Sequence, residues 1–571
     1  MSVGAVVPRA APGAERGARR RRLPSWWGLA ALLALAAALR LSTLDLQSFW
    51  YDEAYTPVHV LHAGLAATMR AVVHSENSPP LWYLLAWLDA RVLGNGEIAL
   101  RLPSALAGIA TVAVAWGIGR ELAGTRAAAA CAALVAVNPL FVWYSQEARA
   151  YALFVLLSAL AMLCFLRARR QPTRGRMAAF ALCSSLALLT HYFSVFLLAP
   201  MVLVLLGDRA TRRAALPAAG VIAAVGAALL PLLIAQGGHH TQWIGRWALT
   251  SRLQAIPQYF LTGYSGAPLG HSVEALIALP LIALLALGVL CVGPPAGASA
   301  RARRGQGPSA AAPPRDRSRE LTIAQSMKLA LLLAGAGILA PIVLAALGAD
   351  YLAPRNLVAA MIPVSALIAV AFAAAAPGSG SRAAGAPASG DGLGTGGASP
   401  ACALQGARRP PAWAETAALA LIGLTLLAFL AVSVDVNLSP RLQRGNWRGL
   451  ARVLRQPSGG RRAITTVELG SAPLEYYLPP LHNAPRGAQL TLDEIDETGY
   501  EPLRRSAGRA PAPGFTLIQR RDIDGLIVYR FRSARPRSVA ESRLRRRVIT
   551  LARPEVLIAP VQRARAGQTG A

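Results

Sequence analysis

Long apolar runs recur along this chain, and they restrict it to folds that lie in a lipid bilayer. Hydrophobic residues make up 54% of the 571 residues and charged residues only 15%, whereas roughly a quarter of a soluble domain is charged. A helix needs roughly 20 apolar residues to cross a bilayer. We therefore predict an α-helical polytopic membrane protein with about eleven spans, near 25–44, 102–119, 127–143, 150–166, 177–190, 193–206, 214–235, 272–292, 328–347, 357–376 and 413–434.

The arginines give the chain a net charge of +30, and many of them lie between the apolar runs. Basic loops beside membrane spans set the orientation of the spans in the membrane. We therefore attribute the positive charge to membrane topology and not to nucleic-acid binding. We expect a multi-pass protein of the plasma (inner) membrane with a cytoplasmic N-terminus and an extracytoplasmic C-terminal domain. The basic loops expected in the cytoplasm are 120–126, 167–176, 208–213 and 301–319.

One apolar stretch, 79–93, decides this topology. It is too short to span and contains Asp89 and Arg91, and counting it as a span would place the basic loop 167–176 outside. We interpret it as an interfacial helix, so 45–101 becomes one large external loop. The first run could instead be a signal peptide, but its length favours an uncleaved anchor. The short fifth and sixth spans could form a tilted or re-entrant pair.

Composition divides the chain further. Residues 1–24 form an Arg-rich arm, and 293–326 and 377–412 are rich in Gly, Ala, Pro and Ser; we expect all three to be disordered and cytoplasmic. They flank or interrupt a transmembrane domain at 25–434. Residues 435–571 predict a small external α/β domain, with a helix at 447–454 and β-like runs at 463–469, 515–518, 526–531 and 548–551. The five cysteines lack CxxC spacing, which argues against a zinc site or a disulfide framework.

The distinctive polar residues gather at the expected external ends of the spans. No Asp, Glu, Lys or Arg lies centrally in a predicted span, which disfavours an ion-coupled transporter. A polar site at the external face suits a reaction between a lipid-borne reactant and an external one. The candidate residues are Asp52, Glu53, His74, Glu76, Asn77, Glu147, Arg149, Tyr151, His191, Tyr192 and Arg355.

Five motifs in a fixed order resemble the GT-C superfamily of membrane glycosyltransferases. They are Phe49-Trp50-Tyr51-Asp52-Glu53-Ala54-Tyr55, Ser78-Pro79-Pro80-Leu81-Trp82-Tyr83, Arg101-Leu102-Pro103-Ser104-Ala105, Tyr144-Ser145-Gln146-Glu147-Ala148-Arg149-Ala150-Tyr151 and Trp447-Arg448. The chain looks most like the glycosyltransferase family 39 type, related to protein O-mannosyltransferases and lipid A aminoarabinose transferases. The resemblance covers 26–206 well and the later spans loosely. Ser78 stands where many relatives have histidine.

The resemblance implies an inverting transfer of a sugar from a polyprenyl-phosphate donor to an acceptor at the external membrane face. It places the family's loop acid at Asp52 or Glu53, and we favour Asp52 as the general base. A guanidinium, from Arg149 or Arg355, could stabilise the leaving phosphate. The donor sugar would be a hexose or pentose, and the acceptor a protein, glycolipid or polysaccharide. A divalent metal could take part, although no ligand set demands one.

The sequence is compatible with two other functions. A polymerase or ligase of envelope polysaccharides would also use lipid-linked glycans in external loops. A flippase or transporter of such glycans is the non-enzyme alternative.

Overall fold

A computed structural model describes residues 25–238, 242–263, 270–292, 321–377, 410–455, 460–547, 549 and 554–558. The predicted arm 1–24 and most of both predicted linkers lie outside these residues. The predicted linker 293–326 is too long at its C-terminal edge, because helix α14 already begins at Ile323. The helix begins there because Thr322 and Gln325 form a capping box that satisfies backbone groups of the first turn.

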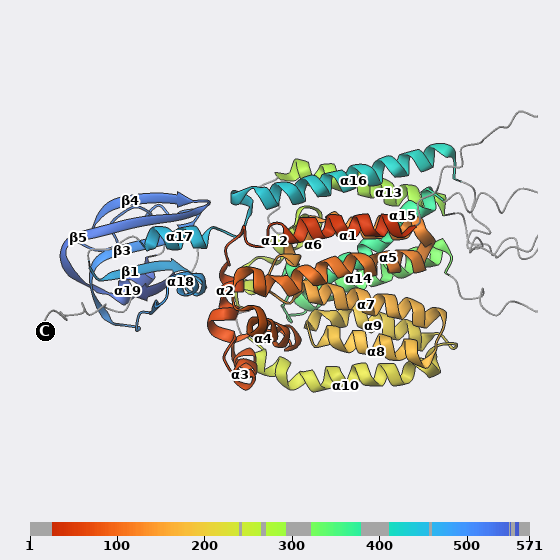
Figure 1. Ribbon diagram of the computed structural model, residues 1–571, viewed down its shortest axis with the longest axis horizontal. Coiled ribbons are helices and arrows are strands. Elements are labelled where there is room, and N and C mark those ends of the chain that lie inside the picture. The colour runs from red at the N-terminus through yellow and green to blue at the C-terminus, as the bar shows by residue number, and fades with distance from the viewer. Residues whose placement is uncertain are drawn as a thin grey trace, which may run out of the picture.

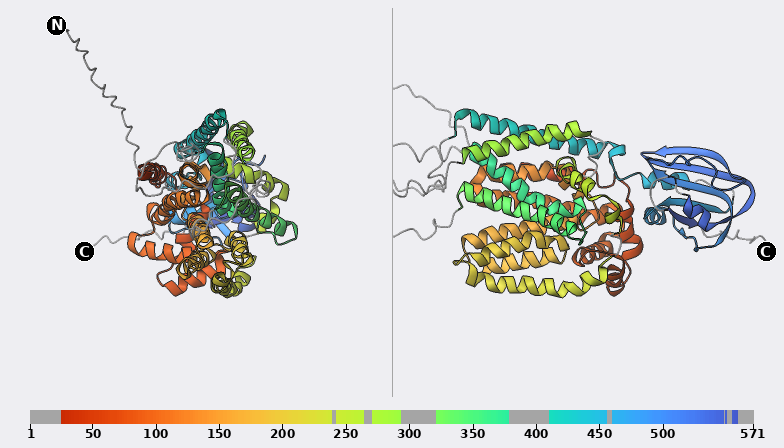
Figure 2. Two further views of the ribbon diagram at one scale, coloured as in Figure 1. Left: turned by 90° about the vertical axis from the view of Figure 1, so that its right-hand side faces the viewer. Right: turned by 180° about the vertical axis from the view of Figure 1, so that it is seen from behind.

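The larger part of the molecule is a bundle of helices that run side by side along one axis (Figures 1 and 2). Long Ala/Leu-rich segments become helices because only internal hydrogen bonding satisfies a backbone in lipid. The long helices are α1 (Ser25–Leu41), α5 (Glu97–Val137), α7 (Tyr151–Arg170), α8 (Arg174–Leu188), α9 (Val195–Gly207), α10 (Arg212–Gln236), α13 (Gly270–Cys291), α14 (Ile323–Ala346), α15 (Met361–Ala375) and α16 (Ala412–Leu438).

The fold is that of a multi-pass membrane protein, as predicted. Among the described residues, seven helical segments are long and apolar enough to cross a membrane, and the apolar helices Trp26–Leu41 and Tyr192–Gly207 are shorter. The predicted count of eleven is therefore not confirmed, although each predicted run overlaps a helix. The stretch 79–93 forms α4 (Leu81–Leu93), of 13 residues, which is not among these segments.

Helix α5 contains a sharp reversal that separates two predicted spans. Its backbone leaves the helical conformation at Ala123 and at Gly124, which has a φ of +80°, a value that glycine adopts readily. A Cβ placed on Gly119 would lie 2.4 Å from the carbonyl oxygen of Ala127. The two halves of α5 thus pack closely, and its C-terminal end returns toward the start of the large loop.

The large loop contains short helices that cover one end of the bundle. They are α2 (Tyr51–Tyr55), the π-helix η1 (Thr56–Val60), α3 (Leu65–Ser75) and α4. Further short elements at the same end are α6 (Pro139–Ser145), η2 (Tyr192–Ser194), α11 (Gln242–Arg246), α12 (Leu249–Thr262), η5 (Pro354–Ala360) and η8 (Pro440–Leu442).

A small α/β domain lies beyond this end of the bundle (Figure 1). Its helices are α17 (Trp447–Leu454), α18 (Ser471–Tyr477) and α19 (Glu541–Arg546), and its strands are β1 (Arg462–Val467), β2 (His482–Asn483), β3 (Gln489–Tyr500), β4 (Thr516–Ile523), β5 (Leu526–Ala540) and β6 (Pro554–Ile558). The strand order is β2-β6-β1-β3-β5-β4, with β1 and β3 parallel and the other pairs antiparallel. We call this unit the sheet domain, and the adjoining end of the bundle the domain end.

Sequence patterns located part of the sheet domain. The helix predicted at 447–454 is α17, and the runs 463–469, 515–518 and 526–531 overlap β1, β4 and β5. Apart from Ile549, the run 548–551 lies outside the described residues. Strand β3 was not predicted because acidic residues occupy its buried positions. There Glu494 and Asp496 face Arg532 and Arg530 of β5, which neutralise them.

The segment before α2 attaches the sheet domain to the bundle. Ser48 donates from its hydroxyl to the carbonyl of Gly445 at 2.9 Å and accepts from the backbone N–H of Trp447 at 2.9 Å. Trp50 packs against Trp447 and Leu450 in one apolar cluster. The loop that carries Asp52 and Glu53 is therefore held between the bundle and the sheet domain.

Candidate functional site

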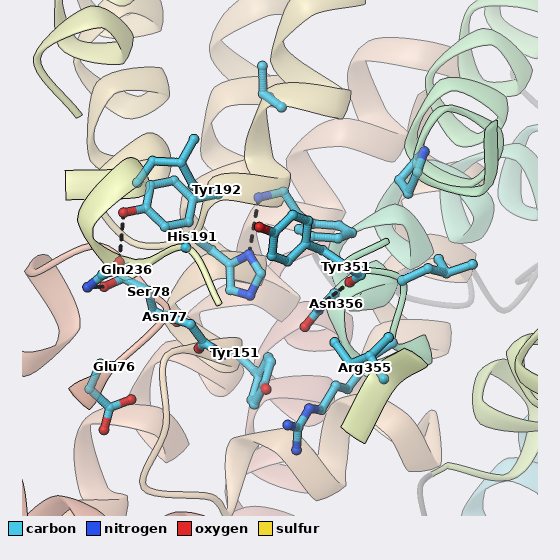
Figure 3. A pocket seen from close by; sticks show the side chains of 18 of the residues that line it. Glu76, Asn77, Ser78, Tyr151, His191, Tyr192, Gln236, Tyr351, Arg355 and Asn356 are labelled. Atoms are coloured by element: carbon cyan, nitrogen blue, oxygen red, sulfur yellow. Dashed lines mark hydrogen bonds between the residues drawn. The ribbon is translucent and has the colours of Figure 1, made fainter. Parts of the chain in front are cut away.

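A cavity of about 400 Å³ opens at the domain end of the bundle. Figure 3 shows Glu76, Tyr151, His191 and Arg355 around it. Its polar lining includes Asp52, Glu76, Asn77, Arg149, Tyr151, His191, Tyr192, Gln236, Tyr351, Arg355 and Asn356. Its apolar lining comes largely from α9, α10 and α14 and the turn before α9, and includes Phe193, Phe196, Leu229, Leu230, Leu233 and Leu344. One cavity thus joins charged groups to an apolar surface within the bundle.

Helix α2 places its two carboxylates in different environments. Asp52 lines the cavity, with its side chain 13% exposed. Glu53 is fully buried and does not line the cavity. Successive residues of a helix point about 100° apart, so one carboxylate faces the cavity when its neighbour faces the protein interior.

Asp52 forms an ion pair with Arg355 on the cavity wall. The Nη1 atom of Arg355 donates to Oδ2 of Asp52 at 2.5 Å, and the Arg355 side chain is 20% exposed. Arg355 lies in η5, in the connection from α14 to α15. The pair therefore brings together two residues that are 303 positions apart in the sequence.

A second charged group on the cavity wall contains Glu76 and Arg149. Nη2 of Arg149 donates to Oε2 of Glu76 at 3.1 Å, and Nη1 of Arg149 donates to the carbonyl of Asp52 at 3.4 Å. The hydroxyl of Tyr83 donates to the same Glu76 oxygen. Burial, together with the hydrogen bond to Glu76, holds the pKa of Tyr83 well above its usual range, so this hydroxyl stays a donor. Arg149 thus links Glu76 to the backbone of α2.

Directly behind the wall, Glu53 is held by Arg101 of α5. Nε and Nη2 of Arg101 donate to the two Glu53 oxygens at 2.7 and 2.6 Å, and the N–H of Ala148 donates to Oε1 at 2.9 Å. Burial alone would raise the pKa of Glu53, but the charge and hydrogen bonds of Arg101 lower it below the usual value. This carboxylate is therefore ionised, fully bonded and not part of the cavity lining.

Glu147 occupies a similar buried position beside Arg444. Nη2 of Arg444 donates to Oε2 of Glu147 at 3.1 Å and to the carbonyl of Trp143 at 2.8 Å. The guanidinium also lies 3.9 Å from the centre of the Trp143 ring. Burial raises the pKa of Glu147 to about 7, although the charge of Arg444 opposes this rise. Glu147 thus binds the segment that leads into the sheet domain, and it does not line the cavity.

On the α10 side, Gln236 connects the cavity walls. The hydroxyl of Tyr192 donates to Oε1 of Gln236 at 2.8 Å, and Nε2 of Gln236 donates to the carbonyls of Val72 and Ser78 at 2.9 and 3.1 Å (Figure 3). These bonds fix the turn that carries Glu76 against the end of α10.

His191 lies on the same side of the cavity and stacks on Phe154, with ring centres 4.5 Å apart. Its Nδ1 accepts from the N–H of Phe193 at 3.2 Å. Burial and the nearby charges of Arg355 and Arg149 lower the pKa of His191 to about 3. The ring is therefore neutral at physiological pH and can contribute an uncharged contact surface.

The structure brings eight of the eleven predicted residues to this cavity, namely Asp52, Glu76, Asn77, Arg149, Tyr151, His191, Tyr192 and Arg355. It does not bring Glu53, Glu147 or His74 there: the first two are buried behind the wall, and His74 is exposed on the last turn of α3. Glu147 and Arg149 are two positions apart in the sequence but form ion pairs with different residues, Arg444 and Glu76.

Sequence reasoning did not select several residues that the structure assigns to the site or its support. Arg101 was within a quoted motif but had no assigned partner, and Gln236 is the polar residue that ends a long apolar run. Arg444 precedes Trp447-Arg448 by only a few positions. The sequence shows each of these three residues in a distinctive position, but it does not show which residue each of them bonds.

The part of the chain that the structure describes does not form an evident metal site. Among the described residues, no group of three or more His, Cys, Asp or Glu side chains could hold an ion. The cavity carboxylates Asp52 and Glu76 are each paired with arginine, whereas metal ions such as Mg²⁺ bind through oxygen ligands that are free to coordinate.

Known proteins share features with this chain. The structure is similar to that of ArnT from Cupriavidus metallidurans in the apo state, with a TM-score of 0.49 and 13% identity over 89% of this chain and 98% of that chain. The same protein bound to undecaprenyl phosphate gives a TM-score of 0.48 at 13% identity, with the same coverage of both chains. The apo oligosaccharyltransferase of Archaeoglobus fulgidus gives a TM-score of 0.40 and 15% identity over 80% of this chain and 60% of that chain.

A family model matches one part of the sequence. Residues 77–234 match the family described as dolichyl-phosphate-mannose-protein mannosyltransferase. No curated protein matches the chain. The matched region runs from the turn that carries Asn77 to the last turns of α10, and it includes Arg149, Tyr151 and His191. The family match confirms, for this region, the resemblance to GT-C membrane glycosyltransferases that the sequence motifs predicted.

Proposed function

We propose that this protein is a membrane glycosyltransferase that moves one sugar from a polyprenyl phosphate to an acceptor hydroxyl. The observation that carries the proposal is the Asp52–Arg355 pair in a cavity that continues along apolar side chains of α9, α10 and α14. A polyprenyl-phosphate sugar needs an apolar surface for its chain and a cation for its phosphate. Its acceptor needs a base within hydrogen-bond reach. The cavity offers all three.

Asp52 is the general base in this proposal. The acceptor oxygen attacks the anomeric carbon from the face opposite the phosphate, and its proton passes to the Asp52 carboxylate. The bond from the anomeric carbon to the phosphate oxygen breaks, and its electron pair stays on the phosphate. The product is a glycoside of inverted configuration together with a free polyprenyl phosphate. Glu53 has no part in this transfer, because Arg101 and Ala148 occupy its oxygens away from the cavity.

Arg355 binds the donor phosphate and stabilises the charge that develops on it. Paired charge-assisted hydrogen bonds from a guanidinium suit a phosphate. Arg355 is bonded to Asp52 in this structure. A donor phosphate that binds the Arg355 guanidinium would weaken this bond, and Asp52 would then be a stronger base. Arg149 supports the same region through Glu76 and the backbone of α2.

The orientation follows from the predicted topology. The domain end, with the cavity and the sheet domain, would face the extracytoplasmic side of the plasma (inner) membrane, and the N-terminus the cytoplasm. The acceptor would be a protein, a glycolipid or a polysaccharide that approaches from this side, next to the sheet domain. Thiol-specific labelling of a cysteine introduced in the exposed strand β4, in intact cells, tests this orientation: labelling by a membrane-impermeant reagent supports it, and protection contradicts it.

The activity is tested with purified protein and a radiolabelled polyprenyl-phosphate hexose or pentose, using membrane extract as the acceptor source. We expect transfer of label by the wild type and its loss in Asp52→Asn. Asp45→Asn is the matched control, because Asp45 is an exposed carboxylate of the same segment and does not line the cavity. Full transfer by Asp52→Asn would refute the assigned base.

A polymerase or ligase remains the alternative enzyme. Replacing the donor by a lipid-linked oligosaccharide separates the two: transfer of an intact oligosaccharide, with no transfer of a single sugar, would favour the alternative. Label that crosses proteoliposomes without bond formation would instead indicate a transporter. Repeating the assay with a chelator tests whether a divalent metal is required.

A further inference from the structure

Helix α12 lies outside the cavity and packs against the segment that carries Arg355. Its apolar residues Leu249, Leu253, Ile256 and Phe260 recur at helical spacing and form one cluster with Leu352 and Leu357. α12 belongs to the connection between α10 and α13. The cluster fixes one face of this connection against η5 and the turn that precedes it.

Within this packed face, Arg252 makes a two-pronged ion pair. Nη1 and Nη2 of Arg252 donate to the two oxygens of Asp350 at 2.6 and 2.7 Å, and Nη1 also donates to the carbonyl of Leu352 at 2.9 Å. The Arg252 side chain is 3% exposed. The hydrogen bonds from Arg252 lower the pKa of Asp350, so the carboxylate is ionised at neutral pH. Arg252 itself does not line the cavity.

The segment held by Arg252 leads directly to the cavity. The N–H of Ala353 donates to the carbonyl of Tyr351 at 3.1 Å, and the N–H of Asn356 donates to the carbonyl of Ala353 at 2.9 Å. Nδ2 of Asn356 donates to the carbonyl of Tyr351 at 3.0 Å (Figure 3). These bonds make residues 351–356 one compact turn, which places Arg355 toward the cavity. A displacement at Asp350 would therefore move Arg355.

We propose that Arg252 is a positioning residue for donor binding, which acts on the phosphate through the Asp350 turn and Arg355. This inference rests on the proposed function, because it assigns the phosphate to Arg355. The geometry supports a specific requirement for arginine, since a planar guanidinium reaches both carboxylate oxygens and a carbonyl together, whereas the ammonium of lysine is a single point charge. A second neighbouring pair provides a contrast: Arg246 and Glu468 are 3.6 Å apart and more than 40% exposed.

The test is a titration of undecaprenyl phosphate into the purified full-length protein, followed by native mass spectrometry. We expect Arg252→Gln and Asp350→Asn each to raise the Kd for this lipid by at least about tenfold, because small misplacements of a binding group are costly. Arg252→Lys should give a smaller rise. Arg246→Gln is the matched control and should bind like the wild type, since exposed pairs contribute little.

Two combined variants distinguish positioning from general weakening of the fold. If Arg252 and Asp350 act as a unit, the double variant binds no worse than either single variant. If Arg252 acts through Arg355, Arg252→Gln causes no further loss in an Arg355→Gln background. Additive losses in both combinations would overturn the proposal, because a global effect on stability would add to each.

The outcome also separates this inference from the proposed function. A wild type that fails to bind undecaprenyl phosphate refutes the proposed donor and the inference with it. A wild type that binds and an Arg355→Gln variant that does not, together with normal binding by Arg252→Gln, overturns the inference alone. If Arg252→Gln yields no folded protein, Asp350→Asn and Arg252→Lys decide, and wild-type affinity in both overturns the proposal.

Discussion

The cavity wall and the layer directly behind it both contain carboxylate–guanidinium pairs, but they differ in solvent access. On the wall, Asp52 and Arg355 are 13% and 20% exposed. Behind it, Glu53 and Arg101 are 0% and 1% exposed. The two carboxylates are adjacent in the sequence, and their partners are the same kind of residue.

This difference shows how environment assigns different tasks to one chemical pair. A fully buried pair is stable only when its remaining hydrogen-bonding groups are satisfied, and removing one partner is costly. Such a pair fixes α2 against α5. A partly exposed pair has solvent and cavity beside it, so either partner can turn to a ligand. Variants of the wall and of the layer behind it should therefore differ in what they lose, activity or stability.

The largest expected effect is on the wall. Asp52→Asn should lower the rate of sugar transfer by about 100-fold to 10,000-fold, the range typical of a lost general base. Because the amide keeps the size of the side chain at a partly open site, the melting temperature should stay close to that of the wild type. Initial rates and thermal unfolding of the same preparation measure both quantities. An unchanged rate would show that Asp52 is not the general base.

The opposite pattern is expected behind the wall. Glu53→Gln removes the charge that balances Arg101 in a fully buried site, which should cost about 3–5 kcal/mol of stability. The measurements are the melting temperature and the fraction of monodisperse protein after extraction. A variant with wild-type stability but no activity would place Glu53 among the catalytic groups and break the comparison.

A pH dependence is expected from Glu147, which is buried beside Arg444. Its pKa is raised from 4.5 to about 7 in the folded protein, so the folded state binds the proton more tightly. The resulting stability is fully present below pH 4.5 and is lost as the pH rises through 7, a change of about 3 kcal/mol. Melting temperatures between pH 5 and pH 8 should fall less steeply in Glu147→Gln than in the wild type. Parallel slopes would contradict this assignment.

A smaller effect is expected from the cation on the wall. Arg355→Gln should weaken binding of undecaprenyl phosphate by roughly 10-fold to 100-fold, since hydrogen bonds to charged groups contribute about 1.5–3 kcal/mol. Arg355→Lys should weaken it less. Asp52→Asn should not weaken it, because Asp52 and the phosphate share this guanidinium. Lipid titrations of the three variants check the order, and weaker binding by Asp52→Asn would argue against a shared partner.

The sequence predicted the helical and membrane character of the chain well, because a run of apolar residues in lipid has few alternatives to a helix. The predicted boundaries of the helices were less accurate. α5 begins at Glu97, before the predicted span at 102, because a helix can extend beyond the hydrocarbon. Strand β3 escaped prediction because Glu494 and Asp496 are buried with arginines of β5, and pairing across strands is not visible in a local pattern.

The sequence by itself determined which polar residues were candidates and that they belong to one end of the bundle. It could do so because apolar runs and basic loops are local patterns that set where each span begins and ends. Only the tertiary structure showed that Asp52 lines the cavity and that Glu53 does not. Their partners lie 303 and 48 positions away, at Arg355 and Arg101, and adjacent residues of a helix point about 100° apart. Which of two neighbouring carboxylates meets the cavity therefore depends on how α2 is turned against α5 and η5. That rotation is a property of the packed molecule.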